Sequence, residues 1–369
     1  MINLPRLPSG QAGRAQGALY GLAIGDALGM PTQLLSRPQI VARWGPLLTG
    51  FEPAPDEHPI AAGHQAGDIT DDTEQAVLLG RLLVAGHGRI DPRELADTLV
   101  AWEADMKARG SLDLLGPSTR RALAAVQAGA PPEEAGATGD TNGAAMRIAP
   151  VGIATPFGAA SPRATPLRAT SPRATPLRAA STEADNSKKP NLETLVDHVE
   201  QASFVTHGTS LALAGAAAVA AAVSAGVSGA SVPEAIAAAI AAARIAAGRG
   251  RWVAGADVAD RIEWATQLVA GLPLAEAADV IYRLVGTGLA TQESVAAAFA
   301  ALTVTPDDPW LTCRFAASLG GDCDTIAAMA GAVAGACHGV AAFPGPAIAV
   351  IDRHRLDLPG LAAALLALR

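Results

Sequence analysis

The sequence predicts an all-α protein folded as one compact multi-helix domain. Apolar residues recur at helical spacing along most of the chain, which places them on one face of each helix. Several of these stretches end in a glycine, which adopts the left-handed conformation at a helix end at little cost. Alanine is in clear excess and aromatic residues make up only 4% of the chain, a composition that suits closely packed helices.

The helical pattern appears in roughly a dozen segments along the chain. They cover residues 14–28, 74–86, 92–106, 118–129, 191–204, 211–226, 233–247, 257–271, 292–302, 325–339 and 358–368. The second, fourth and eighth of them end in Gly86, Gly129 and Gly271. Nothing in the 369 residues divides the pattern into two separate cores, so we expect one domain over residues 12–369.

The stretch from Gly208 to Pro233 differs from the others because it contains no charged residue. A membrane span is conceivable on length, but the body of the stretch is mostly alanine and glycine, which gain little on transfer to lipid. We therefore expect a helix that is buried on all sides within the protein.

One segment lies outside the helical pattern. Residues 161–170 read SPRATPLRAT and residues 171–180 read SPRATPLRAA, a near-perfect duplication rich in proline and arginine. Frequent proline blocks helix and sheet alike, and the segment is too polar to bury. We expect a disordered surface insertion over residues 159–190; a basic docking arm is the functional alternative.

Charge and cysteine content narrow the classes of function. The net charge of −8 offers no electrostatic footprint for nucleic acid and favours metal ions or cationic groups. The three cysteines have no C-x-x-C spacing, so we expect reduced core thiols and no zinc site. The first residues lack an apolar signal segment, which favours a cytoplasmic protein that is not bound to membranes.

Two acidic clusters each precede an apolar helix. The first holds Thr70, Asp71 and Asp72, and the second holds Asp322, Asp324 and Thr325. Helix capping explains one acid in each, including a capping box between Asp71 and Glu74. Adjacent carboxylates repel unless a cation or a proton is present, and hard oxygen donors suit Mg²⁺ or Mn²⁺. Double capping and a shared metal site therefore both remain open on composition.

Five ordered motifs carry a resemblance to a known family. GALYGLAIGDALGMPTQ, TDDTEQAVLL, GDTNGAAMRIAPVGI, SFVTHGTSLALAG and GGDCDTIAAMAGAVAGA run from about residue 12 to about residue 340. Together they are similar to the ADP-ribosylglycohydrolase family, which includes the dinitrogenase reductase-activating glycohydrolase. The resemblance implies an all-α fold with two magnesium ions in a cleft, where the N-glycosidic bond at the anomeric carbon of a ribose is cleaved.

The same resemblance implies roles for individual residues. The metal ligands of the family fall on Thr70, Asp71, Asp72, Asp322, Asp324 and Thr325. Cleavage of such a bond develops positive charge on the sugar and needs a base for the attacking water, for which Asp72 or Asp322 is our candidate.

The remaining motifs are expected to shape the substrate pocket. In the family, the loop that corresponds to residues 139–143 contacts the ribose or its phosphates, and His207 matches a position near the substrate. The residues of this loop are Gly139, Asp140, Thr141, Asn142 and Gly143. A helix-capping turn for the loop, and a core or capping role for the histidine, are the simpler alternatives.

Gln33 marks a departure from the family. Many relatives have a glutamate here that contacts the metal or the ribose, whereas an amide can coordinate or bind a sugar but cannot act as a base. The change points to a modified cleft and leaves the substrate open.

Three functions follow. The first is an Mg²⁺-dependent hydrolase that removes ADP-ribose from a modified side chain such as arginine. The second is a hydrolase of a small nucleoside or nucleotide N-glycoside. The third is a non-catalytic binding or structural member of the family, which six retained ligands argue against.

Overall fold

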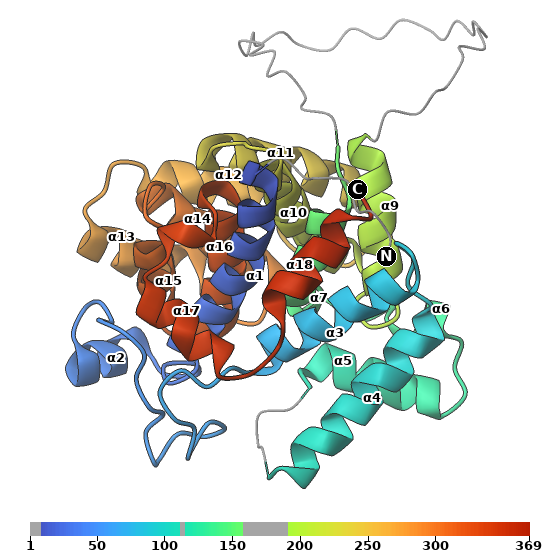
Figure 1. Ribbon diagram of the computed structural model, residues 1–369, viewed down its shortest axis with the longest axis horizontal. Coiled ribbons are helices and arrows are strands. Elements are labelled where there is room, and N and C mark those ends of the chain that lie inside the picture. Colours follow the sequence, from blue (N-terminus) through green and yellow to red (C-terminus); the bar gives the residue numbers. More distant parts are fainter. Residues whose placement is uncertain (1–8, 111–114, 158–190) are drawn as a thin grey trace, which may run out of the picture.

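The protein is helical throughout the part that the structure describes. The computed structural model describes residues 9–110, 115–157 and 191–369, so the expected insertion at 159–190 lies outside them. Within those ranges there are eighteen α-helices, and the β-structure consists of two isolated bridges, Thr141 with Ala290 and Thr209 with Arg251. The prediction of an all-α domain is confirmed (Figure 1).

The helices follow in this order: α1 (Ser9–Gly29), α2 (Arg37–Trp44), α3 (Asp71–Ala85), α4 (Pro92–Ala108), α5 (Pro117–Gln127), α6 (Pro132–Ala135), α7 (Gly143–Arg147), α8 (Ala149–Ala154), α9 (Leu192–Ser203), α10 (Ser210–Val227), α11 (Val232–Ala246), α12 (Val258–Val269), α13 (Leu274–Val280), the π-helical turn η1 (Ile281–Val285), α14 (Thr291–Val304), α15 (Pro309–Ala317), α16 (Cys323–His338), the 3-10 turn η2 (Val340–Ala342), α17 (Gly345–Asp352) and α18 (Leu358–Leu366).

Helix α10 is the buried helix that the sequence predicts. It is long and apolar enough to cross a membrane, but it is buried inside the protein, where it packs against α11, α16, α8 and α7. The Thr209 hydroxyl caps its first turn by accepting a bond from the backbone N–H of Ala212. Burial among other helices accounts for the absence of charge, so the membrane alternative is not needed.

Helices α1 and α16 form the most extensive helix pair of the protein, although they lie near opposite ends of the chain (Figure 1). From Gly17 to Gly29 a glycine occupies every fourth position of α1, and the backbones of these four glycines touch the backbone of α16. A Cβ atom on Gly25 would overlap the carbonyl oxygen of Ala327, and one on Gly29 would overlap the backbone of Asp324. Contact at this range requires glycine, and it fixes the end of α1 against the start of α16.

Two glycines with left-handed backbone lead into α16. Gly320 has φ of +88° and Gly321 has φ of +72°, a region that favours glycine over other residues. Gly321 exchanges backbone hydrogen bonds with the segment after α1, donating to Leu35 O at 2.8 Å and accepting from Leu34 N at 2.7 Å. The Asp322 amide donates to Thr287 O at 2.7 Å, so the chain entering α16 is held from both sides.

Candidate active site

The first acidic cluster lies at the start of α3, where Asp26 of α1 holds it in place. The fully buried carboxylate of Asp26 accepts bonds from the backbone N–H and hydroxyl of Thr70, at 3.0 and 2.7 Å, and from those of Thr73. Asp26 is therefore a structural acid that fixes the first turn of α3. Thr70, and not Asp71, is the N-cap residue, because its hydroxyl accepts from the Asp72 amide.

The proposed capping box is absent because Glu74 is engaged elsewhere. Its carboxylate accepts a bond from the indole N–H of Trp102 and forms an ion pair with Arg109 at 3.1 Å. The acids at the start of α3 are therefore not accounted for by a capping box.

Asp322 occupies the N-cap position of α16 but makes no side-chain capping bond. Its carboxylate instead accepts a bond from the side-chain amide of Asn142, which also donates to Ser294 Oγ at 3.0 Å. Burial raises the pKa of Asp322 to about 6, against the lowering effect of the bonds from Asn142 and Thr325. A helix cap would not require this arrangement, so double capping does not explain the second cluster.

The two clusters meet inside the protein. Thr325 Oγ1 of α16 lies 3.3 Å from Asp72 Oδ2 of α3, and its single proton is shared between the carboxylates of Asp72 and Asp322. Burial raises the pKa of Asp72 well above its usual range, and nearby carboxylates raise it further. Those carboxylates belong to Asp71, Asp324, Asp26 and Asp322. Acids from both ends of the sequence thus share one buried, negatively charged region.

The residues present fit a divalent cation by their chemistry. Asp72 Oδ1 is buried and has no hydrogen-bond partner among the described residues, which is costly for a carboxylate oxygen unless something else binds it. Across the described ranges, no three His, Cys, Asp or Glu side chains are arranged to hold a metal ion by themselves. Threonine hydroxyls and water would have to complete the shell, as Mg²⁺ readily allows.

The loop of residues 139–143 lies against the start of α14. The backbone N–H of Asn142 donates to the backbone carbonyl of Leu289 at 3.1 Å, and the Thr291 hydroxyl donates to the backbone carbonyl of Asp140 at 2.7 Å. The side chain of Asp140 is exposed, whereas Thr141 Oγ1 lies 3.1 Å from His207 Nε2. The structure therefore joins two of the expected substrate-binding residues, Thr141 and His207, directly to each other.

The glycines of this loop have a packing reason that sequence reasoning did not identify. A Cβ atom on Gly139 would overlap Thr206 O, and one on Gly143 would overlap the imidazole of His207. These glycines make room for the segment before α10, whether or not a ligand also approaches them. The side-chain amide of Asn142, which is expected to bind substrate, contacts Asp322.

His207 is completely buried beside a cation. Burial lowers its pKa well below the usual range, and the charges of Arg147 and Arg121 lower it further. The imidazole is therefore neutral at pH 7 and acts in the folded protein as a hydrogen-bonding group.

Gln33 follows α1 and is buried, with 4% of its surface exposed. The backbone N–H of Gln33 donates to Gly29 O at 2.9 Å, and the backbone carbonyl oxygen of Gln33 lies 2.9 Å from His58 Nε2. The position after α1 is thus fixed by backbone bonds, which places Gln33 near the Gly29–Asp324 contact.

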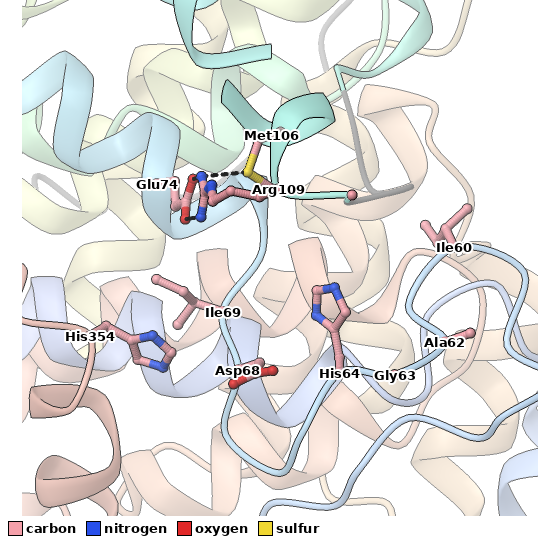
Figure 2. A pocket seen from close by; sticks show the side chains of 11 residues that line it. Ile60, Ala62, Gly63, His64, Asp68, Ile69, Glu74, Met106, Arg109 and His354 are labelled. Atoms are coloured by element: carbon pink, nitrogen blue, oxygen red, sulfur yellow. Dashed lines mark hydrogen bonds and ion pairs between the residues drawn. The ribbon is translucent and has the colours of Figure 1, made fainter. Parts of the chain in front are cut away.

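A pocket of about 450 Å³ opens beside the first cluster (Figure 2). The expected metal ligands do not line it, but Asp68 and Glu74, on either side of Thr70–Asp72 in the sequence, do. His64 and His354 also line it, and Figure 2 shows Arg109 at one end with Glu74. The pocket therefore borders the acidic cluster and does not contain it.

Sequence reasoning missed the polar residues that support the acids. Arg147, Gln75, Thr206 and Ser294 are all buried, and all hydrogen-bond to site residues or to each other. A single arginine in the apolar stretch AAMRIAPVGI was a signal, because an arginine is rarely buried without a specific partner.

Comparison with known proteins identifies the family. The sequence profile described as ADP-ribosylglycohydrolase matches residues 7–369. The chain belongs to the ADP-ribosylglycohydrolase family. The resemblance found in the five motifs is thereby confirmed, and with it the assignment to a family of hydrolases.

Relatives of this ADP-ribosylglycohydrolase family member differ in how much of the chain they cover. The Escherichia coli K12 protein named uncharacterized protein YegU is 34% identical over 95% of this chain and 96% of its own length. The ADP-ribosyl-[dinitrogen reductase] glycohydrolase of Rhodospirillum rubrum is 32% identical over 38% of this chain and 45% of its own. A solved structure titled ADP-ribosylglycohydrolase-related protein complex superposes with a TM-score of 0.65 at 24% identity, covering 97% and 99% of the two chains, and supports the fold.

Proposed function

We propose that the protein is an Mg²⁺-dependent hydrolase that removes ADP-ribose from a modified side chain such as arginine, by cleaving the N-glycosidic bond at the anomeric carbon of the ribose. One observation carries the proposal: the Thr325–Asp72 hydrogen bond joins the two acidic clusters in a buried site. The family of glycohydrolases and the Rhodospirillum rubrum relative support the class of bond.

In this proposal two Mg²⁺ ions, or Mn²⁺, bind to the oxygen donors of both clusters. The ligands are Thr70, Asp71, Asp72, Asp322, Asp324 and Thr325. When bound, the ions supply Lewis acidity that lowers the pKa of a water molecule and orients the ribose hydroxyls. The unpartnered Asp72 Oδ1 supports this assignment, because a cation would satisfy it.

The chain's own carboxylates then serve the reaction in two ways. Asp72 or Asp322 accepts the proton of the attacking water. Negative charge in the site stabilises the positive charge that develops on the ribose. The Asn142 amide orients Asp322 for either role.

The pocket beside the first cluster supports a cationic leaving group. Its volume of about 450 Å³ suits a small organic group, and two carboxylates, those of Asp68 and Glu74, line it. Arg109 already neutralises Glu74, so Asp68 is the carboxylate that we propose meets a guanidinium group.

A substrate panel tests the proposal. Purified protein is incubated with ADP-ribosylarginine and with a set of nucleosides and nucleotides, each with Mg²⁺ and with EDTA. We expect Mg²⁺-dependent release of ADP-ribose from ADP-ribosylarginine. Release from nucleosides alone would favour the hydrolase of a small nucleoside or nucleotide, an alternative that the amide at Gln33 supports. No release from any substrate would favour a non-catalytic binding protein. Action in the cytoplasm, without nucleic acid or membrane, is part of the same proposal.

A further inference from the structure

Arg147, the last residue of α7, is a buried cation with neutral partners. It is 1% exposed, and its guanidinium donates to Gln75 Oε1 at 2.8 Å and to Thr206 Oγ1 at 2.6 Å. Its Nε atom is buried and has no hydrogen-bond partner within the described residues. The side chain thus reaches two elements that are distant in sequence.

The burial of this charge is costly to the fold. Burial lowers the pKa of Arg147 to about 10, although the negative charge of Asp71 partly opposes the change, so the group stays positive at pH 7. A buried ion without a directly contacting counter-ion destabilises the folded protein, because nothing replaces its lost hydration in full. An apolar side chain at position 147 would stabilise the buried core more than a charged one does, so we look for a role of the Arg147 guanidinium other than packing.

One of the two hydrogen bonds of Arg147 leads, through Gln75, to Asp71 of the first acidic cluster. Because Gln75 Oε1 accepts from the guanidinium, the Gln75 amide is fixed with its Nε2 toward Asp71, and it donates to Asp71 Oδ2 at 2.8 Å. Gln75 and Asp71 are four residues apart on α3, the spacing at which helix side chains meet. The orientation of the Asp71 carboxylate therefore depends on Arg147.

The other hydrogen bond leads to the 139–143 loop. Thr206 Oγ1 accepts from the guanidinium, so its single proton is available to His207 Nδ1 at 2.8 Å, which is nearer than the Ser203 carbonyl at 3.4 Å. His207 is then protonated on Nε2, which donates to Thr141 Oγ1 at 3.1 Å. Thr141 keeps its own hydroxyl proton to donate to a ligand.

We propose that Arg147 is a positioning residue that orients Asp71 through Gln75 and Thr141 through Thr206 and His207, so that the metal ligand and the substrate loop are held in one hydrogen-bonded chain. The inference rests on the proposed function for the roles of Asp71 and Thr141. Side chains that hydrogen-bond to a metal ligand commonly contribute about 10- to 100-fold to metal affinity or activity, which is the size of effect expected here.

Variants of Gln75 and Thr206, which each break one hydrogen bond of Arg147, test the proposal together with variants of Arg147 itself. Mn²⁺ binding is measured by calorimetry and electron paramagnetic resonance, and ADP-ribose binding by calorimetry. We expect Gln75→Leu to weaken Mn²⁺ binding about tenfold, Thr206→Val to weaken ADP-ribose binding about tenfold with Mn²⁺ affinity unchanged, and Arg147→Met to do both. Arg147→Lys should restore neither in full, because a lysine lacks the planar fork that reaches both partners.

A spectroscopic measurement covers the case in which Arg147→Met fails to fold. In protein with ¹⁵N-labelled histidine, the ring nitrogens of His207 should report the Nε2–H tautomer in the wild type and lose this preference in Thr206→Val. Arg93→Met, on the exposed face of α4, is the matched control. Unchanged Mn²⁺ affinity in Gln75→Leu, or the Nδ1–H tautomer in the wild type, would overturn the inference. These measurements need no turnover. A wild-type protein that binds Mn²⁺ and ADP-ribose but hydrolyses nothing would therefore contradict the proposed function without contradicting the positioning role of Arg147.

Discussion

Thr325 on α16 donates a hydrogen bond to Asp72 on α3, although 253 residues separate them in sequence. This contact places two carboxylate-rich helix starts in one buried region, where burial and the surrounding carboxylates raise the pKa of Asp72. Two helix caps that happened to be acidic would have no reason to meet. The arrangement is the basis of the predictions about metal and substrate.

Asp324→Asn should eliminate metal-dependent hydrolysis while the helices stay intact. The substitution keeps the size of the side chain and removes the charge, which the proposed cation needs; we expect a loss of about 100-fold or more in kcat/KM. Circular dichroism checks the fold and an ADP-ribose release assay checks the activity. The exposed Asp307→Asn is the control, and full activity in Asp324→Asn would contradict the ligand assignment.

Asp26→Asn should weaken both stability and metal binding. The carboxylate of Asp26 accepts four hydrogen bonds from Thr70 and Thr73, and an amide group would face these donors with its own N–H groups. We expect a loss of about 1–3 kcal/mol in the free energy of unfolding, measured by urea denaturation. The same change at Asp97, which is exposed on α4, should have almost no effect; equal stability of the two variants would show that Asp26 does not hold the start of α3.

Two glycines of α1 give a matched pair. Gly25→Ala should destabilise the protein by about 3 kcal/mol or prevent folding, because the new Cβ overlaps the backbone of Ala327. Gly13→Ala lies on the same helix with nothing within 4 Å of the new Cβ, and should stabilise by about 0.5–1 kcal/mol. Urea denaturation of both variants measures the difference, and the close contact of α1 with α16 would be refuted by similar values.

Acid should destabilise the protein partly through His207. Burial lowers the pKa of this histidine in the folded state, so below about pH 6.5 the unfolded chain binds a proton that the folded chain does not. The free energy of unfolding therefore falls as the pH falls from about 7 to about 5, with a slope of up to roughly 1.4 kcal/mol per pH unit for each such group.

His207→Gln tests the origin of that slope. The variant should lose part of the pH dependence but not all of it, because burial also lowers the pKa values of His58 and His198. Urea denaturation at several pH values measures the slopes. A slope that is the same in the variant and the wild type would assign the acid sensitivity to other groups.

Asp68→Asn should affect the leaving group and spare the ADP-ribose. We expect kcat/KM for ADP-ribosylarginine to fall about tenfold, because the pocket loses the carboxylate proposed to meet the guanidinium, while the affinity for free ADP-ribose stays unchanged. Steady-state kinetics and calorimetry give the two values. Equal losses for both ligands would place Asp68 elsewhere in the mechanism.

Sequence reasoning located the helices where the pattern was long. The stretch 211–226 predicts α10, and its lack of charge correctly indicates burial on all sides. Short helices such as α6 and α7, of 4 and 5 residues, were missed, because so few residues span little more than one turn and carry no periodicity.

Contacts between distant segments were the least predictable part of the site. The motifs placed Asp72 and Thr325 in the same site, but only through the family resemblance; their hydrogen bond depends on the packing of three helices. Asn142 shows the limit most clearly, because nothing in GDTNGAAMR indicates that its amide points at Asp322. The role of Arg147 likewise depends on partners 72 and 59 residues away.

The glycine contact between α1 and α16 also constrains how this protein can change. Because the backbones of α1 and α16 touch without intervening side chains, the two helices cannot slide or tilt against each other without a clash. The acids that they carry, Asp26 and Asp324, are therefore held in fixed positions. Adaptation to a new substrate must therefore occur at exposed or half-buried positions of the connecting segments, such as residues 62–66 beside the pocket and Asp140, and not at the packed Gly139, Asn142 and Gly143. Sequence variation among relatives should concentrate at such positions, whereas the small residues at every fourth position of α1 should be retained.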